Sequence, residues 1–355
     1  MTVIGEKRRF PLYWKIALPV IIAGLVFAGY KGYNIYHDIY SPNVSLKPET
    51  SAYFYIPTGA GMEDVVKRLY EKNYIMDKAS FEWVAEKKNY KRHVHPGRYL
   101  IRNNMSNNAL INLLRSGKQE PVKVVINNRL IFKHELAARV AEYLETDSVS
   151  LVQLLGDEQF ADKYGFNTRT ILCMIIPNTY YFNWNTSAEE FFGRMAAEYK
   201  KFWTDKRKQR AGAIGLSQSE VAVLASIVEL ETLMEDEKSR IAGVYINRLR
   251  KRMLLQADPT VKYALGDFSI RRVLKKHTRF DSPYNTYKYP GLPPGPICLP
   301  SISTMDAVLY HEEHDYLFFC AKEDFSFFLN FAKTLRQHSA NARRYQKALN
   351  ERGIR

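Results

Sequence analysis

Two glutamates near the end of a predicted helix are the residues best suited to acid–base chemistry. The spacing from Ser217 to Glu220 is that of a capping box, which predicts that a helix begins there. The apolar stripe of this helix, at intervals of three and four residues, is formed by Leu224, Ile227 and Val228. Glu231 is the next position on the stripe, so we expect its carboxyl group to be partly desolvated. Desolvation raises the pKa of a carboxyl group, which suits a general acid near neutral pH.

Glu229 lies about 200° round the same helix. It shares a face with Ala222, Ala225 and Ser226. We therefore interpret Glu231 as the acid, and Glu229 as a residue that either faces solvent or supports the site from behind. A second interpretation of Glu231 stays open, because the chain after this helix is acidic at Glu235, Asp236 and Glu237. Glu231 can simply lie at the rim of that acidic end.

The stretch from Gln256 to Val261 offers two further polar side chains. Asp258 precedes Pro259, which is the pattern of a helix N-cap followed by proline at the first helical position. That structural role is sufficient to explain Asp258. Gln256 has no such role, and its amide can form hydrogen bonds with a substrate.

A proline-rich run from Ser282 to Ile297 predicts a long, stiff loop, because proline disfavours helices and central strands. Three tyrosines of this loop can stack on sugar faces: Tyr284, Tyr287 and Tyr289. Asn285 and Thr286 can hydrogen-bond to hydroxyl or acetamido groups. The alternative is a buried structural loop, in which tyrosine is also common.

The histidines and cysteines do not suggest a metal site. His311 and His314 lack the spacing of the zinc-binding H-E-x-x-H motif. The three cysteines are Cys173, Cys298 and Cys320. They have no C-x-x-C spacing, which argues against a cysteine-based zinc site and a disulfide framework.

The elements that position these residues belong to a chain of 355 residues, long enough for about two domains. Apolar residues make up 46% and charged residues 25%, which excludes collagen-like and wholly disordered chains. Lys and Arg total 52 against 37 Asp and Glu, so the formal net charge is +15. This charge indicates acidic partners, namely lipid headgroups, an anionic polymer or nucleic acid.

The N-terminal residues contain a membrane-targeting signal, an apolar stretch from Ile16 to Tyr30. The basic residues before it are Lys7, Arg8, Arg9 and Lys15. We favour a retained anchor over residues 16–34, with residues 1–15 in the cytoplasm, because flanking aromatic residues extend the span. The alternative is a signal peptide cleaved near Val26 and Ala28. Either interpretation exports the rest of the chain, which argues against nucleic acid as the partner.

Beyond the anchor, the pattern predicts an α+β fold class in two parts. Residues 35–50 are polar and contain Pro42 and Pro48, as a linker does. Residues 51–118 predict a small module of two strands, at 53–56 and 99–101, and two short helices, the second capped by Ser106. Residues 119–355 begin with a strand and then predict a larger, mostly helical α+β domain.

These motifs, in this order, resemble the MltG, or YceG-like, family of bacterial endolytic lytic transglycosylases. The resemblance covers nearly the whole chain, including the anchor and a LysM-like module. The motifs that carry it are Ile176–Tyr180, Ala225–Thr232, Tyr245–Leu249, Leu255–Val261, Tyr284–Tyr287 and Gly291–Gly295.

The resemblance implies an enzyme that cleaves nascent peptidoglycan strands between MurNAc and GlcNAc without water. The product would be a 1,6-anhydroMurNAc end, and strand elongation would stop there. Glu231 matches the family's catalytic glutamate, which acts first as acid and then as base, and no metal or organic cofactor is implied. The candidates for glycan binding are Glu229, Gln256, Asp258, Tyr284, Asn285, Thr286, Tyr287, Thr179 and Tyr180.

The implied partners are peptidoglycan glycan strands, inner-membrane lipid and peptidoglycan synthases, with a periplasmic catalytic domain. Two departures from the family pattern stand out. Leu230 occupies a position where a charged residue is common, and Leu329–Phe331 lacks the histidine of the family's His-x-Phe pattern. We leave that position out of the site, and His338 is a candidate for another family histidine. The competing function is a non-catalytic peptidoglycan-binding envelope protein, and Glu231 discriminates between the two.

Overall fold

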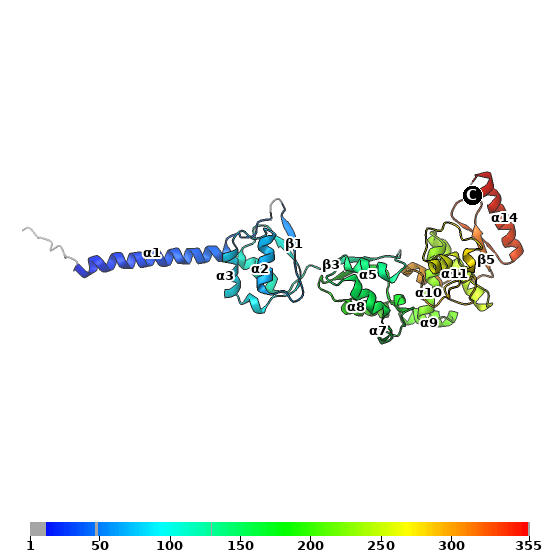
Figure 1. Ribbon diagram of the computed structural model, residues 1–355, viewed down its shortest axis with the longest axis horizontal. Helices are drawn as coiled ribbons and strands as arrows, with labels where there is room; N and C mark the ends of the chain where they lie inside the picture. The colour runs from blue at the N-terminus through cyan, green and yellow to red at the C-terminus, as the bar shows by residue number, and fades with distance from the viewer. Residues whose placement is uncertain (1–11, 47–48, 129, 354–355) are drawn as a thin grey trace, which may run out of the picture. The chain divides into compact units, whose positions relative to one another are not determined.

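The computed structural model describes residues 12–46, 49–128 and 130–353. Its contacts divide the chain into two compact units, drawn mainly in blue and cyan and in green to red (Figure 1). The first unit extends to Pro121 and includes Asn183–Asn185, and the second consists of Val122–Phe182 and the residues from Thr186 onward. Together they form a mostly helical α+β protein with small antiparallel sheets. The basic residues Lys7, Arg8 and Arg9 lie outside the described residues.

Helix α1 (Leu12–Tyr40) continues through Pro19 without a break. From Trp14 onward it is the one described helix that is, by itself, long and apolar enough to cross a membrane, with a mean hydropathy of 1.6. Its apolar side chains are exposed, for example Leu25 at 68%. A helix that exposes apolar side chains all round is suited to lipid rather than water.

The first unit pairs β1 (Ser51–Ile56) antiparallel with β2 (Gly97–Arg102). Its other elements are α2 (Met62–Glu71), α3 (Lys78–Lys87), a 3₁₀ turn (Tyr90–Arg92) and α4 (Asn107–Arg115). Both predicted strands are confirmed, and Ser106 caps α4 by accepting a hydrogen bond from the Ala109 N–H at 3.3 Å. The prediction of two helices missed α3, although Phe81, Val84 and Ala85 form its buried stripe.

The predicted linker over residues 35–50 is wrong as far as residue 46. Residues 35–40 belong to α1, and Val44 and Leu46 are buried in the first unit's core. The side chain of Asn43 bonds to the backbone of residues 76 and 77 and to Asn107. Polar composition misled the prediction because these polar groups are satisfied inside the unit rather than by water.

The second unit begins with β3 (Val122–Ile126), which pairs antiparallel with β4 (Asn178–Phe182). Three helices and a 3₁₀ turn lie between these strands: α5 (Lys133–Ala141), α6 (Ser148–Gly156), α7 (Glu158–Lys163) and the turn Ile171–Met174. Six elements follow before residues 282–297, which we call the tyrosine loop: α8 (Ala188–Phe202), α9 (Asp205–Ile214), α10 (Gln218–Glu231), α11 (Glu235–Arg250), α12 (Asp258–Leu265) and the turn His277–Arg279. The chain then forms α13 (Ile302–Leu309), a hairpin of β5 (Phe318–Ala321) and β6 (Leu329–Ala332), and α14 (Leu335–Glu351).

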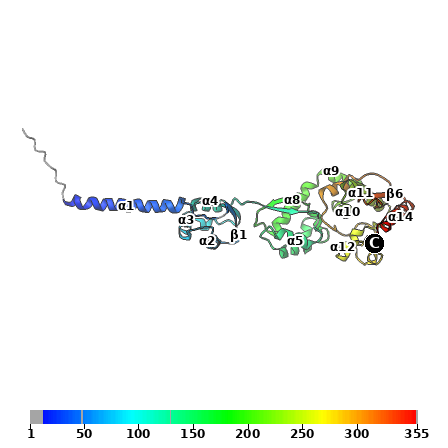
Figure 2. The ribbon, with the colours of Figure 1, turned by 90° about the horizontal axis from the view of Figure 1, so that it is seen from above.

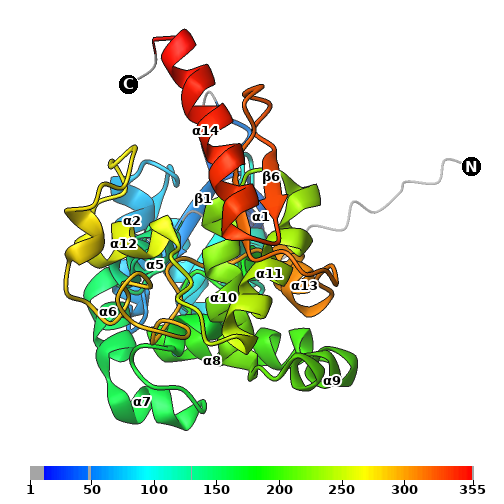
Figure 3. The same ribbon diagram turned by 90° about the vertical axis from the view of Figure 1, so that its right-hand side faces the viewer.

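Helix α10 is the centre of the second unit. Its predicted capping box is confirmed, since the Ser217 N–H donates to Glu220 Oε2 at 2.8 Å and the Glu220 N–H donates to Ser217 Oγ at 3.2 Å. The residues from Val221 to Glu229 are all buried. The helix packs against α11, α12 and α13, while α14 packs on β5 and β6 (Figures 2 and 3). The neighbours of α10 can therefore supply side chains around its C-terminal end.

Candidate active site

A cavity of about 260 Å³ opens at the C-terminal end of α10. It is lined by Glu231, Tyr245, Arg248, Leu255, Gln256, Asp258, Tyr287, Phe319 and His338. Four residues predicted for the site thus meet here: Glu231, Gln256, Asp258 and Tyr287.

Glu231 is the last residue of α10. The hydroxyl of Tyr245 donates a hydrogen bond to Glu231 Oε1 at 2.5 Å. Burial raises the pKa of Glu231 from 4.5 to about 7; the hydrogen bond from Tyr245 opposes this rise, and the negative charge of Asp258 adds to it. The residue keeps partial solvent exposure because it lines the cavity, while protein atoms surround its carboxyl group. A carboxyl group with this pKa can both hold and release a proton near neutral pH.

The pKa of Glu229, two residues earlier, is shifted in the opposite direction to that of Glu231. It is 8% exposed. Its carboxylate accepts hydrogen bonds from Asn128 Nδ2 (2.7 Å), Lys238 Nζ (3.1 Å), the Ser301 N–H (3.0 Å), Ser301 Oγ (2.7 Å) and the Thr304 hydroxyl. Burial alone would raise the pKa of Glu229, but the hydrogen bonds from Thr304, Ser301 and Asn128 outweigh it and lower the pKa to about 2. Glu229 is therefore ionised at neutral pH.

Of the two roles considered for Glu229, the structure supports the internal one. Glu229 does not face solvent, and it does not line the cavity. It instead ties α10 to α11 and α13 through Lys238 and Thr304. The apolar-stripe argument does not separate the two glutamates, because α10 is buried on all sides from Val221 to Glu229. Their hydrogen-bond partners and their positions relative to the cavity separate them.

Helix α11 supplies the residues behind Glu231. Tyr245 is 1% exposed, and its ring meets the ring of Phe319 edge-on with centroids 5.8 Å apart. Arg248, nearly one turn further along, donates to the carbonyl oxygens of Leu255 and Leu317, each at 2.7 Å. These bonds hold the segment before α12 and the residue before β5 beside the cavity.

The predicted N-cap role of Asp258 is wrong by one position. Helix α12 begins at Asp258 itself, its N-cap is Ala257, and no side chain caps it. Asp258 Oδ1 instead accepts a hydrogen bond from the Tyr287 hydroxyl at 2.6 Å. Gln256 is exposed, lines the cavity and has a left-handed backbone with φ of 51°. Its N–H donates to the Thr286 carbonyl at 3.1 Å, which holds this conformation in place.

The tyrosine loop is partly structural, as its alternative interpretation held. Asn285 is 0% exposed and donates to the carbonyl oxygens of Thr278 (3.0 Å) and Phe280 (2.7 Å). Thr286 is 1% exposed, and its hydroxyl accepts a hydrogen bond from the Ala257 N–H at 3.0 Å. The side chains of Asn285 and Thr286, both predicted to contact glycan, are therefore engaged in holding the loop and the start of α12.

The three tyrosines of the loop have different surroundings. Tyr287 lines the cavity. Tyr284 is half-buried against Tyr263, with ring centroids 4.7 Å apart, and does not line the cavity. Tyr289 is exposed and donates to Asp281 Oδ1 at 2.7 Å. The cavity therefore offers one tyrosine of this loop to a ligand.

Thr179 and Tyr180 lie on β4 and do not line the cavity. The hydroxyl of Tyr180 is buried and donates to the Ile176 carbonyl at 2.6 Å. Thr179 is exposed and pairs with Val125 of β3. The structure thus gives this motif a role in the β3–β4 pair, and the hydroxyl of Tyr180, predicted to contact glycan, is occupied by the protein itself.

Four lining residues were not proposed for the site from sequence: Tyr245, Arg248, Leu255 and Phe319. His338, the candidate for another family histidine, also lines the cavity. His338 stacks on Phe318 with centroids 5.4 Å apart, and burial lowers its pKa. Among the described residues its buried Nδ1 has no hydrogen-bond partner. Tyr245 and Arg248 carry polar groups among the buried residues of α11, and this pattern could have indicated them from the sequence. No local pattern could place Phe319, since long-range packing brings β5 to the cavity, and His338 was named only through the family resemblance.

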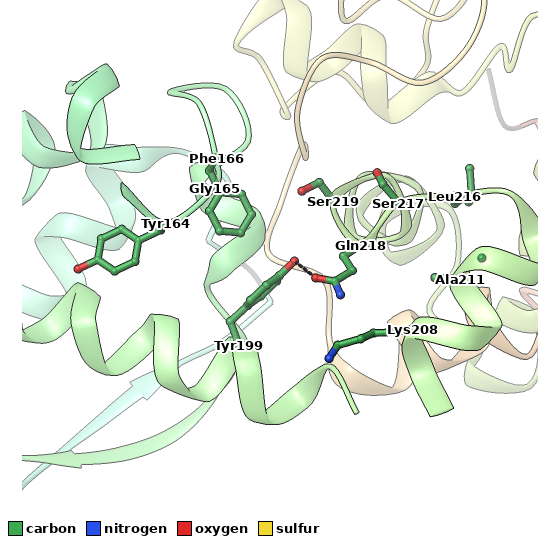
Figure 4. Close-up of a pocket in the computed structure, with 11 residues that line it drawn as sticks. Tyr164, Gly165, Phe166, Tyr199, Lys208, Ala211, Leu216, Ser217, Gln218 and Ser219 are labelled. Carbon is green, nitrogen blue, oxygen red and sulfur yellow. Dashed lines mark hydrogen bonds between the residues drawn. The ribbon is translucent and has the colours of Figure 1, made fainter. Parts of the chain in front are cut away.

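A larger pocket of about 500 Å³ lies elsewhere in the second unit (Figure 4). Tyr164, Phe166 and Tyr199 line it, and the Tyr199 hydroxyl donates to Gln218 Oε1 at 3.0 Å. None of its lining residues is a carboxylic acid. We therefore place the candidate active site in the smaller cavity, which is lined by a carboxyl group with a raised pKa.

The His311–His314 sequence is held by protein contacts. The Tyr316 N–H donates to His314 Nδ1 at 3.1 Å, so His314 Nε2 carries the proton and donates to the Arg240 carbonyl at 2.9 Å. Across residues 12–46, 49–128 and 130–353, no cluster of three or more His, Cys, Asp or Glu side chains has the arrangement of a metal site.

Comparison with known proteins identifies the family. The sequence model of the YceG-like family matches residues 54–344. The chain belongs to the YceG-like family. The resemblance stated from the sequence motifs is therefore confirmed.

Relatives of this YceG-like chain include the endolytic murein transglycosylase of Bacillus subtilis. It is 29% identical over 319 residues, which cover 86% of this chain and 87% of that protein. The endolytic murein transglycosylase of Streptococcus pneumoniae is 26% identical over 340 residues. That match covers 86% of this chain but 60% of the relative, so the chain spans less than two thirds of that protein. A crystal structure of a YceG-like protein from Listeria monocytogenes has a TM-score of 0.55 at 29% identity, covering 82% of this chain and 98% of that one.

Four of the motifs that carry the resemblance meet at the cavity of this YceG-like chain. Glu231 comes from the motif Ala225–Thr232, and Tyr245 from Tyr245–Leu249. Asp258 comes from Leu255–Val261, and Tyr287 from Tyr284–Tyr287. The motif residues that do not line the cavity, such as Asn285 and Thr286, support those that do.

Proposed function

We propose that this protein is an endolytic lytic transglycosylase of peptidoglycan with Glu231 as its general acid and base. The observation that carries the proposal is the carboxyl group of Glu231, which lines a cavity and has a pKa of about 7. A group that must first give and then accept a proton works best with a pKa near the working pH. The substrate and reaction class come from the relatives, which are named endolytic murein transglycosylases.

The reaction needs one proton-transferring group. Protonated Glu231 donates its proton to the glycosidic oxygen between MurNAc and GlcNAc, and the bond from C1 to that oxygen breaks with its electron pair on the oxygen. GlcNAc leaves with a hydroxyl group. The carboxylate of Glu231 then takes the proton of the MurNAc 6-hydroxyl, whose oxygen attacks C1. The product carries a 1,6-anhydro bridge, no water is consumed, and Glu231 is protonated again.

The hydrogen bond from Tyr245 assigns the two oxygens of Glu231 different tasks. Oε1 is held by the Tyr245 hydroxyl at 2.5 Å. Among the described residues Oε2 has no hydrogen-bond partner, so Oε2 is the oxygen free to exchange a proton with the glycan. A neutral tyrosine is suited to this position, because burial and the charge of Glu231 raise the pKa of Tyr245 well above its usual value.

The same proposal includes the location of the chain. We infer that α1 is retained as an anchor in the inner membrane, with the N-terminus in the cytoplasm and the second unit in the periplasm. The end of α1 is joined to the first unit, since the Asp38 carbonyl accepts a hydrogen bond at 2.8 Å from Asn107 of α4. Residues 51–118 would form the LysM-like module and residues 119–355 the catalytic domain. The partners would be glycan strands, membrane lipid and peptidoglycan synthases.

Mass spectrometry of glycan strands after incubation with the protein tests the proposed reaction. We expect products with 1,6-anhydroMurNAc ends from wild type and none from Glu231→Gln, whose amide cannot donate and accept the proton in turn. The matched control is Glu189→Gln, the same change at an exposed position of α8, which should cleave like wild type. A desolvated carboxyl group replaced by a neutral amide should not lower thermal stability.

Each other outcome has a defined meaning. Products with reducing ends would show hydrolysis and overturn the proposed reaction. Glycan binding without cleavage by wild type would favour the non-catalytic peptidoglycan-binding function. Full activity of Glu231→Gln would overturn the role of Glu231.

A further inference from the structure

A second carboxyl group, that of Asp258, lines the cavity and has no part in the proton transfers of Glu231. Asp258 is the first residue of α12, yet it caps no backbone N–H there. Its Oδ1 accepts a hydrogen bond from Tyr287 at 2.6 Å, and both residues face the same cavity. A role in starting the helix therefore does not account for where this side chain lies.

The backbone behind Asp258 is held firmly. The Ala257 N–H donates to Thr286 Oγ1 at 3.0 Å, and the Thr260 hydroxyl donates to the Ala257 carbonyl at 2.6 Å. The hydroxyls of Thr260 and Thr286 lie 2.8 Å apart, and both residues are fully buried. Asp258 and Tyr287 are thus carried by two segments that are bonded to each other, which fixes the carboxylate relative to the cavity.

No positive side chain neutralises Asp258 among the described residues, since every ion pair that they form involves other acids. Arg248 also lines the cavity, but its guanidinium donates to the carbonyl oxygens of Leu255 and Leu317. Lys262 of α12 acts on Glu231 through its charge but does not bond to Asp258. A fixed carboxylate without a counter-charge is poised to interact with positive charge that arises in the cavity.

Such charge arises in the reaction proposed above. As the glycosidic bond breaks, electron density leaves C1 of MurNAc, and the ring oxygen shares the resulting positive charge in an oxocarbenium-like transition state. This charge is absent from the bound substrate and from the anhydro product. A group that stabilises it lowers the barrier without tightening substrate binding.

We propose that Asp258 stabilises this developing positive charge and that Tyr287 positions its carboxylate. The inference rests on the proposed function. Asp258 forms no covalent bond and exchanges no proton: Glu231 gives and regains the proton, the 6-hydroxyl oxygen closes the ring, and Asp258 ends unchanged. The electrostatic effect of Asp258 on Glu231 is consistent with two carboxyl groups that act on one ligand.

Asp258→Asn in the full-length protein tests this role, because the amide keeps the size and the acceptor for Tyr287 but removes the charge. We expect kcat to fall roughly 100-fold, the size of effect of one transition-state contact. KM should stay within about threefold, because the charge is absent from the ground state. The alkaline limb of the pH–rate profile should also move to lower pH, since the charge that helps to raise the pKa of Glu231 is gone. Arg248, Lys262, Tyr245, Tyr287 and His338 are the other titratable groups that face Glu231 or line its cavity, and this variant leaves them in place.

The matched control is Asp281→Asn, on the segment that leads into the tyrosine loop. Asp281 is exposed and pairs with Lys288 and Tyr289 outside the cavity, so this variant should keep wild-type kcat and the wild-type pH profile. Tyr287→Phe is the second variant, because it keeps the charge of Asp258 and removes the hydrogen bond that orients it. We expect its kcat to fall roughly tenfold, the effect of one hydrogen bond.

The inference is overturned if Asp258→Asn turns over anhydro-ended product at the wild-type rate, or if its loss lies entirely in KM. If Asp258→Asn does not fold, Tyr287→Phe decides, and an unchanged kcat there overturns the inference. Anhydro products from wild type with no effect of either variant would leave the proposed function standing while this inference fails. Products with reducing ends from wild type would overturn both.

Discussion

The hydroxyl of Tyr245 lies 2.5 Å from Oε1 of Glu231, and both groups are enclosed where α10 and α11 pack together. This hydrogen bond stabilises the ionised form of Glu231, whereas burial destabilises it. The pKa of about 7 is therefore a balance, and removal of the tyrosine hydroxyl should shift it in a known direction.

We predict that Tyr245→Phe raises the pKa of Glu231. The alkaline limb of the pH–rate profile should then move to higher pH, opposite to the shift expected for Asp258→Asn. We also expect kcat at the optimum to fall roughly tenfold, because the carboxyl group loses one orienting hydrogen bond. Steady-state rates across pH, measured for both variants beside wild type, check the two signs.

Tyr284→Phe is the control for Tyr245→Phe. It removes the same atom from a half-buried tyrosine that does not line the cavity, so the pH profile should not move. If the limb moved to lower pH in Tyr245→Phe, the balance described for Glu231 would be wrong.

The features that could be predicted from the sequence depend on neighbours in the chain. The predicted capping box at Ser217 joins residues three apart, and it is present. Glu231 could be identified from its motif. The apolar periodicity that favoured Glu231 over Glu229 was uninformative, because α10 is buried on all sides from Val221 to Glu229. Asp258 and Gln256 were found because their types and order could be read locally.

The features that could not be predicted depend on long-range contacts. Thr286 was read as a glycan contact because a hydroxyl in a stiff loop is indistinguishable from one that bonds to a backbone 29 residues away. Asn43 was read as linker because its partner, Asn107, lies 64 residues further along. Polar side chains report their chemistry in the sequence, but only packing determines whether a ligand or the protein itself satisfies them.

Glu229→Gln is predicted to destabilise the second unit by about 3 kcal/mol at pH 7, because it leaves the buried ammonium of Lys238 without its buried counter-charge. Lys238 is 2% exposed, and its remaining partner, Glu235, is mostly exposed. Urea unfolding followed by the fluorescence of Trp203, the tryptophan of the second unit, measures the loss. Glu189→Gln, an exposed change of the same kind, should unfold like wild type.

The same carboxylate predicts how stability depends on pH. The pKa of Glu229 falls from 4.5 in the unfolded chain to about 2 in the folded one, so its contribution is complete above pH 4.5 and is lost as the pH falls towards 2. The difference in unfolding free energy between wild type and Glu229→Gln should therefore shrink below pH 4.5. A difference that stayed constant down to pH 2 would contradict the ionised state assigned to Glu229.

Asn107→Ala is predicted to release the end of α1 from the first unit. Asn107 is 1% exposed; its amide donates to the Asp38 carbonyl (2.8 Å) and Ser80 Oγ (3.0 Å), and its oxygen accepts from Asn43 (2.7 Å). Its removal leaves these buried groups unpaired, at a cost of about 2 kcal/mol. Hydrogen exchange of residues 41–46 should accelerate in the full-length protein, while β3 and β4 of the second unit keep their wild-type exchange. Asn108→Ala, its neighbour on α4, is the control, and unchanged exchange in Asn107→Ala would show that the Asn43–Asn107 contact does not hold this segment to the unit.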